Sequence, residues 1–116
     1  MDTGLGKTTS RGVGGWTPPN VVIGPNDTEV EVAGMKLNFL YTPDTEAPAE
    51  LIIYFPKLRV LNLAELSVKA MHNVLTLRGA QVRSSLAWAQ YIDQVLDLYA
   101  KDAEVMIAQH HWPTWG

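Results

Sequence analysis

The sequence predicts a mixed α/β fold in which several short strands precede one long helix and a final strand. Three observations carry this prediction. Apolar and polar residues alternate in the first half of the chain, apolar residues recur at helical spacing between residues 84 and 100, and a short apolar run follows at residues 104–108. The chain has 116 residues, 47% of them hydrophobic, so it can hold one domain with a real core.

The first strands are expected in the segment that follows an irregular, Gly- and Pro-rich start. Residues 21–23 form a brief apolar run that ends at a Gly-Pro pair, and this run is strand-like. Residues 29–32 and 35–41 alternate between polar and apolar positions. The Ala-Gly pair at residues 33–34 lies between them and is typical of a hairpin turn.

A second pair of strands is expected at residues 51–55 and 59–63, joined across Pro56 and Lys57. The first of these reads Leu-Ile-Ile-Tyr-Phe without a polar break. Such a continuous apolar run is typical of a strand that is covered on both faces.

One helix is predicted from Ser84 or Ser85, either of which can cap its N-terminus, to about Ala100. Its apolar face follows the spacing i, i+4, i+7, i+8 and i+11, and the residues at these positions are Trp88, Ile92, Val95, Leu96 and Tyr99. The strand at residues 104–108 follows the helix.

The composition excludes several classes of function. The net charge is −3 and the pI is about 5.5, so binding of nucleic acid through a basic surface is not expected. The chain has no cysteine, which removes disulfides and thiolate metal sites, and any bound metal must use His, Asp or Glu. No apolar run reaches the roughly 18 residues of a transmembrane segment, and no signal peptide is recognisable, so the compartment stays open.

Both ends of the chain are expected to be cuts through a larger domain. Residues 1–20 form an irregular loop segment rich in glycine and proline, and residues 21–116 form the rest. Two Trp and two His among the last seven residues are costly to leave in water.

The run Gly-Leu-Gly-Lys-Thr-Thr at residues 4–9 is similar to the end of a phosphate-binding loop. The motif needs a glycine five residues before Gly6, where this chain has Met1, and it also needs a helix directly after the loop. No nucleotide site is therefore expected here.

Two acidic residues lie at the ends of predicted strands. Glu46 is in a turn between two strands, and Glu65 follows the strand at residues 59–63. Each is either a solvated surface acid or a carboxylate ligand placed at a strand end.

Polar donors gather in residues 71–80, where His72, Asn73, Thr76 and Arg78 lie within a short apolar frame. Arg with amide and hydroxyl donors nearby suits a tetrahedral oxyanion such as sulfate or phosphate. The alternative is a connector with a surface arginine.

His110 and His111 follow the last predicted strand. They are either structural or metal ligands, because imidazole is the commonest metal ligand among side chains. Trp112 and Trp115 either cap a core or line an apolar pocket.

Taken together, four runs resemble the alkyl sulfatases of the metallo-β-lactamase superfamily. They are TEAPAE at residues 45–50, AE at 64–65, the HN and TLRGAQVR runs within 72–83, and AQHHWPTWG at 108–116. The resemblance covers nearly the whole chain. It implies the second half of a metallo-β-lactamase αββα sandwich, with a mixed sheet and one long helix. It also implies hydrolysis of sulfate esters of long-chain alcohols, dodecyl sulfate among them, and an expected homodimer.

The resemblance assigns metal ligands. It implies two zinc ions, with Glu46 as a ligand to one, Glu65 as the carboxylate that bridges both, and His110 as a ligand to the other. Carboxylate and imidazole groups are a ligand set that zinc accepts without thiolates.

The resemblance also assigns residues to the sulfate group. Asn73 and Arg78 match groups that hold the sulfate, and His72 and Thr76 lie in the same stretch. The family includes secreted, periplasmic and intracellular members, so it does not fix the compartment.

The main zinc signature of the superfamily, HxHxDH, is absent from these 116 residues. The chain therefore carries only part of the expected ligand set, and we expect it to be inactive alone. Two other interpretations stay open. One is a truncated, non-catalytic module that binds an anion or a partner chain, and the other is one half of a split enzyme.

Overall fold

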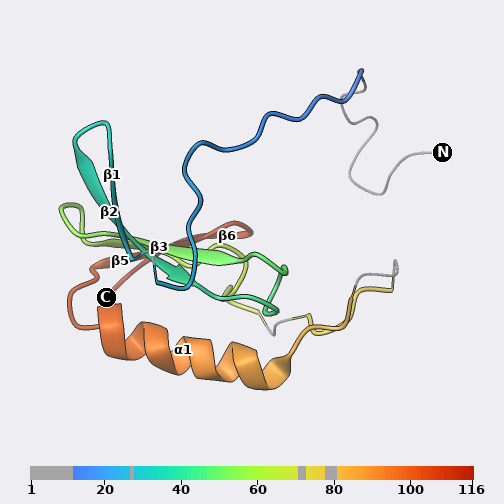
Figure 1. Ribbon diagram of the computed structural model, residues 1–116. Coiled ribbons are helices and arrows are strands. Elements are labelled where there is room, and N and C mark those ends of the chain that lie inside the picture. Colours follow the sequence, from blue (N-terminus) through green and yellow to red (C-terminus); the bar gives the residue numbers. More distant parts are fainter. Residues whose placement is uncertain (1–11, 27, 71–72, 78–80) are drawn as a thin grey trace.

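The computed structural model describes residues 12–26, 28–70, 73–77 and 81–116. Within these ranges, six strands form one mixed sheet in the order of the chain, and one helix lies along a face of that sheet (Figure 1). The elements are β1 Glu29–Val32, β2 Met35–Tyr41, β3 Leu51–Phe55, β4 Val60–Asn62, α1 Ser85–Tyr99, β5 Val105–Ala108 and β6 His111–Trp115. The predicted mixed α/β fold with one long helix is confirmed.

The β1–β2 hairpin forms because its two turn residues adopt the left-handed conformation. Ala33 has a φ of 51° and Gly34 a φ of 78°, as a two-residue hairpin turn with the twist of the strands requires. The pairing Val32↔Met35 closes directly on this turn, as predicted.

The connection from β3 to β4 is longer than expected. Residues 56–59 form two successive turns, in which the Leu58 amide donates to the Phe55 carbonyl and the Arg59 amide to the Pro56 carbonyl. Arg59 itself has a positive φ of 53° and belongs to the turn. The strand predicted at residues 59–63 is therefore shorter at both ends, as β4.

The pair formed by β4 and β5 is parallel, unlike the other pairs of this sheet. β4 and β5 pair in the register Val60↔Val105, Leu61↔Met106 and Asn62↔Ile107, and α1 lies in the crossover between them. Parallel strands end at the same edge of a sheet. The residues that follow β4 and those that follow β5 are thereby brought together.

The last residues form strand β6, which the sequence pattern did not predict. β6 pairs antiparallel with β5, with Val105↔Trp115 and Met106↔Thr114 in register. Pro113 obscures the strand pattern, but a strand at the end of the sheet order tolerates a proline because one of its edges needs no donor.

The strand-like run at residues 21–23 is not a strand. Val21 is 60% exposed and Val22 is 71% exposed, and neither takes part in the sheet. A short apolar run forms a strand only where a neighbour offers hydrogen bonds. Residues 12–20 also contain no helix or strand, and the segment leaves the sheet (Figure 1).

The core lies between the sheet and α1. Ile52 and Tyr54 on β3 are buried, as are Val95 and Tyr99 on α1, and the rings of Tyr54 and Tyr99 are 5.0 Å apart. The alternate residues of β3 are only half-buried. The prediction that both faces of this strand are covered is thus correct for the helix-facing side only, within the described part of the chain.

Among the described residues, no helix has the length and apolar character needed to cross a membrane.

Candidate functional site

The parallel pair brings Glu65 and His110 into contact. Beyond the strands, the Leu63 amide donates to the Ile107 carbonyl at 2.9 Å, and the Gln109 amide donates to the Ala64 carbonyl at 3.2 Å. These two hydrogen bonds keep the chain segments side by side after β4 and β5 have ended, as far as Glu65 and His110. The His110 Nε2 atom then lies 2.6 Å from Glu65 Oε1, although the two residues are 45 positions apart.

A tight turn after β4 aims Glu65 out of the core. The Ala64 amide donates to Asn62 Oδ1 at 2.9 Å, and Ala64 has a positive φ of 48°. The Leu66 amide donates to the Leu63 carbonyl, and both leucines are buried. The two buried leucines anchor the turn, so Glu65 between them projects outward with its side chain 38% exposed.

Glu46 lies on a loop that closes on itself between β2 and β3. The Thr42 amide donates to the Glu50 carbonyl at 2.9 Å, and Thr45 Oγ1 donates to the Thr42 carbonyl at 2.7 Å. Thr42 and Thr45 are fully buried. This Glu46 loop, residues 42–50, is thus a structured turn and not a solvated connection, which the sequence pattern did not reveal.

Arg83 joins the Glu46 loop to the Asn73 loop, residues 73–77. Its Nε donates to the Glu46 carbonyl at 3.0 Å, its second terminal nitrogen pairs with Glu46 Oε1, and its first donates to the Asn73 carbonyl. The Arg83 side chain is only 12% exposed. Sequence reasoning did not select Arg83; the available signal was its place at the end of the TLRGAQVR run, directly before the helix cap.

The electrostatics of this edge favour a bound cation. The hydrogen bond with His110 lowers the pKa of the Glu65 carboxyl, and Arg83 and Glu46 act in the same direction. Burial raises the pKa of Glu50, and the neighbouring carboxylates Glu46 and Glu65 raise it further. Among these five side chains, three carboxylates share one guanidinium, so negative charge is in excess.

The four residues predicted to hold sulfate divide into two groups. His72 and Arg78 lie outside the described residues. Asn73 is exposed, and its Oδ1 accepts the Leu75 amide at 3.2 Å. Thr76 Oγ1 is buried and has no hydrogen-bond partner within the described part of the chain, so this hydroxyl has an unused donor.

The three predicted metal ligands gather at one edge of the structure. Glu65 touches His110, and Glu46 lies near enough to help lower the pKa of Glu65. Carboxylate oxygens and an imidazole nitrogen with excess negative charge fit a zinc ion chemically. Among the residues that the structure describes, however, no group of three His, Asp or Glu side chains has the arrangement of a metal site.

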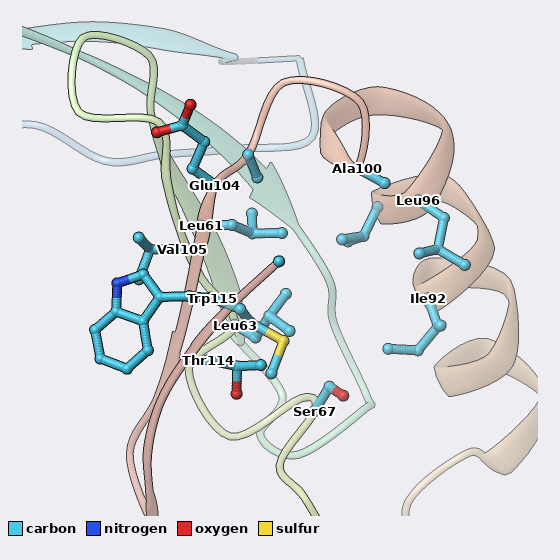
Figure 2. Close-up of a pocket in the computed structure, with 14 residues that line it drawn as sticks. Leu61, Leu63, Ser67, Ile92, Leu96, Ala100, Glu104, Val105, Thr114 and Trp115 are labelled. Carbon is cyan, nitrogen blue, oxygen red and sulfur yellow. The ribbon is translucent and has the colours of Figure 1, made fainter.

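An apolar pocket of about 290 Å³ lies between α1 and the β4–β6 part of the sheet (Figure 2). Trp115 lines this pocket, whereas Trp112 is 88% exposed. Leu96 lines it from the helix and is 55% exposed, so the apolar face predicted for the helix extends beyond the part that the sheet covers.

No family model matches the chain. Over its whole length it is 44% identical to an (R)-specific secondary-alkylsulfatase of a Pseudomonas species and 41% identical to a linear primary-alkylsulfatase of a Pseudomonas species. It is also 41% identical to an alkyl/aryl-sulfatase of Saccharomyces cerevisiae. The chain spans only 17–18% of the length of these relatives.

Solved structures show the same relationship. A stereoselective inverting sec-alkylsulfatase of a Pseudomonas species matches 85% of this chain and 16% of its own, with a TM-score of 0.80 and 46% identity. A metallo-β-lactamase family protein of Thermus thermophilus matches 85% of this chain and 31% of its own, with a TM-score of 0.63 and 24% identity, and so shares the fold. Over its whole length the chain is thus similar in sequence to one segment of the alkyl sulfatases, and it shares the metallo-β-lactamase fold.

Proposed function

We propose that the chain is part of a zinc-dependent alkyl sulfatase that hydrolyses sulfate esters of long-chain alcohols at a site with two zinc ions. One observation carries the proposal: Glu65 and His110 meet at 2.6 Å where β4 and β5 end, with Glu46 beside them. The names of the relatives give the substrate class, because they are primary and secondary alkylsulfatases.

Some residues of this chain would bind the zinc ions, and others would bind the sulfate group of the substrate. Zinc ions, when bound, neutralise charge on the ester and lower the pKa of a water molecule. Glu65 would bridge the two ions, while Glu46 and His110 would each hold one of them. The excess of carboxylates at this edge favours such cations electrostatically.

On the substrate side, Arg78 would pair with the sulfate oxygens through its planar fork of donors. Asn73 would donate from its amide nitrogen, because its Oδ1 already accepts a backbone amide. The Thr76 hydroxyl, which has no hydrogen-bond partner among the described residues, would add a donor, and His72 would complete the group. These donors would stabilise the charge that develops on the sulfate group as the ester is cleaved.

The purified 116-residue chain should not turn over dodecyl sulfate, because the described residues hold no complete metal site. Sulfate release would be followed with and without a chelator. Hydrolysis that the chelator abolishes would show that these residues are sufficient, and would contradict this expectation.

A chimera tests the function itself. The matching 117 residues of the Pseudomonas secondary-alkylsulfatase would be replaced by this chain, which is 44% identical to them. We expect the chimera to bind zinc and to hydrolyse an alkyl sulfate. A folded chimera that binds zinc but is inactive would argue against the proposal.

Two variants of the chimera separate the proposed roles. Glu65→Ala should remove most of the activity and lower the zinc content, since a bridging ligand touches both ions. Arg78→Ala should lower activity while zinc stays bound, because the proposed role of Arg78 is to bind the sulfate and not the metal. Loss of zinc from the Arg78 variant would assign Arg78 a different role.

A second candidate is a half-site that a separate chain completes, or a non-catalytic binding module. The incomplete ligand set of the described residues and the exposed Trp112 and Leu96 favour this alternative. An immunoblot of the native source against residues 110–116 decides between them. A band several times larger than 12.8 kDa supports the longer sulfatase, and a band at that mass supports a separate module. The homodimer stays a prediction.

A further inference from the structure

We propose that Arg83 is a positioning residue that sets the distance between the metal-binding and the sulfate-binding parts of the site, an inference that rests on the proposed function. Its guanidinium contacts the Glu46 loop and the Asn73 loop at the same time. Glu46 is a proposed zinc ligand, and Asn73 is a proposed sulfate ligand.

The geometry explains why an arginine is needed here. Nε and one terminal nitrogen bind the carbonyl and the carboxylate of the same residue, Glu46, while the other terminal nitrogen points to the Asn73 carbonyl. Only a planar group with several fixed donors can serve three acceptors on two loops. A lysine could keep the charge but would offer one nitrogen for acceptors that lie on both sides.

Arg83 is itself held firmly from both sides. Its amide donates to the Val74 carbonyl at 3.0 Å, so the backbone contacts the Asn73 loop as well. The next residue, Ser84, caps α1 by accepting the Ala87 amide, and its own amide donates to the Asp44 carbonyl of the Glu46 loop. The start of α1 is therefore the fixed point to which both loops are attached.

The ion pair between Arg83 and Glu46 is largely buried, so its loss should disturb the two loops more than the loss of an exposed ion pair would. The Arg83 side chain is 12% exposed and that of Glu46 is 16% exposed. By contrast, Arg59 makes the same kinds of contact, an ion pair with Glu104 and a bond to the Asp102 carbonyl, but its side chain is 49% exposed. Arg59 lies away from both loops and is a matched control.

The first experiment measures amide hydrogen exchange in the 116-residue chain and in Arg83→Lys, Arg83→Met and Arg59→Met. In both Arg83 variants the Leu75 amide should exchange about tenfold faster, the effect of losing one charge-assisted bond. The Asp44 and Glu50 amides should lose protection in the Met variant and largely keep it in the Lys variant. The Leu63 amide, which donates to the Ile107 carbonyl of β5, should not change.

Unchanged Leu75 exchange in both Arg83 variants would overturn the inference, and so would the same loss in the Arg59 variant. The outcome does not depend on sulfatase activity, so it stands apart from the proposed function.

The second experiment places Arg83→Lys in the sulfatase chimera. Zinc content should stay the same, while kcat/KM for dodecyl sulfate should fall about tenfold or more. A kcat/KM equal to that of the parent chimera would overturn the positioning role. An inactive parent chimera would instead overturn the proposed function, and the exchange measurement would still decide whether Arg83 ties the loops.

Discussion

The sheet–helix core and the edge that carries Glu46, Glu65 and His110 are stabilised in different ways. The core is apolar and packs regular elements together, with Ile52, Tyr54 and Tyr99 at its centre. The edge consists of turns that contact each other through charged side chains and backbone carbonyls. Each core element carries an apolar pattern within its own residues, whereas the edge contacts of Glu46 with Arg83 and of Glu65 with His110 depend on residues 37 and 45 positions apart. Substitutions should therefore affect the two regions separately.

The largest effect is expected from Ile52→Ala. Ile52 is fully buried between the sheet and α1, and such a truncation leaves a cavity that costs about 3 kcal/mol of the free energy of unfolding. Urea unfolding measures this loss. Leu98→Ala is the control, because Leu98 on the same helix is 51% exposed, and it should change the free energy by less than about 0.5 kcal/mol. Equal losses in both variants would mean that α1 does not pack on the sheet as described.

A medium effect is expected from Ser84→Ala, which lies where the two regions meet. Ser84 Oγ accepts the Ala87 amide at 3.1 Å, and losing this cap should cost about 1 kcal/mol. Ser85→Ala tests the neighbouring serine, which is the first helical residue and not the cap. If Ser85→Ala were the more damaging, the helix would begin one residue later than it does here.

The smallest effect is expected from Glu50→Gln in the metal-free chain. This substitution should increase the free energy of unfolding. Burial raises the pKa of Glu50 above its ordinary value of 4.5, so the folded chain binds this proton more tightly than the unfolded chain. The stability that Glu50 contributes is fully present below pH 4.5 and is lost as the pH rises through the raised pKa. At pH 7 the Gln variant should therefore unfold at higher urea than the natural chain.

That advantage should shrink as the pH falls through the raised pKa and be lost below pH 4.5, where Glu50 is protonated in both states. Unfolding curves at pH 7 and pH 4 measure the difference. A stabilisation that is the same at both pH values would show that it does not come from the charge.

Local patterns predicted the core well because the apolar spacing and the capping residues that define each element lie within or next to that element. The helical spacing from Trp88 to Tyr99 and the cap at Ser84 are examples. The same reasoning was wrong for residues 21–23, because an apolar run needs a neighbouring strand, and it missed β6, because Pro113 breaks the pattern.

At the edge, the sequence pointed to Glu46, Glu65 and His110 through strand ends and a family resemblance. It could not show that β4 and β5 are parallel, which is what brings Glu65 to His110. Arg83 was missed for the same reason. Its neighbours in the sequence do not indicate that it contacts Asn73 and Glu46, which are 10 and 37 residues away.

The parallel β4–β5 pair also has a kinetic consequence. Pairing Val60 with Val105 requires closure of a long chain loop, and this loop contains both α1 and the Asn73 loop. Closing such a loop lowers the entropy of the chain before any stabilising contact has formed. Non-local pairings therefore form slowly during folding. The β1–β2 hairpin needs no such closure and can form early. Glu65 and His110 would therefore meet among the last events of folding, so that a nascent chain would acquire this edge only after its sheet is complete.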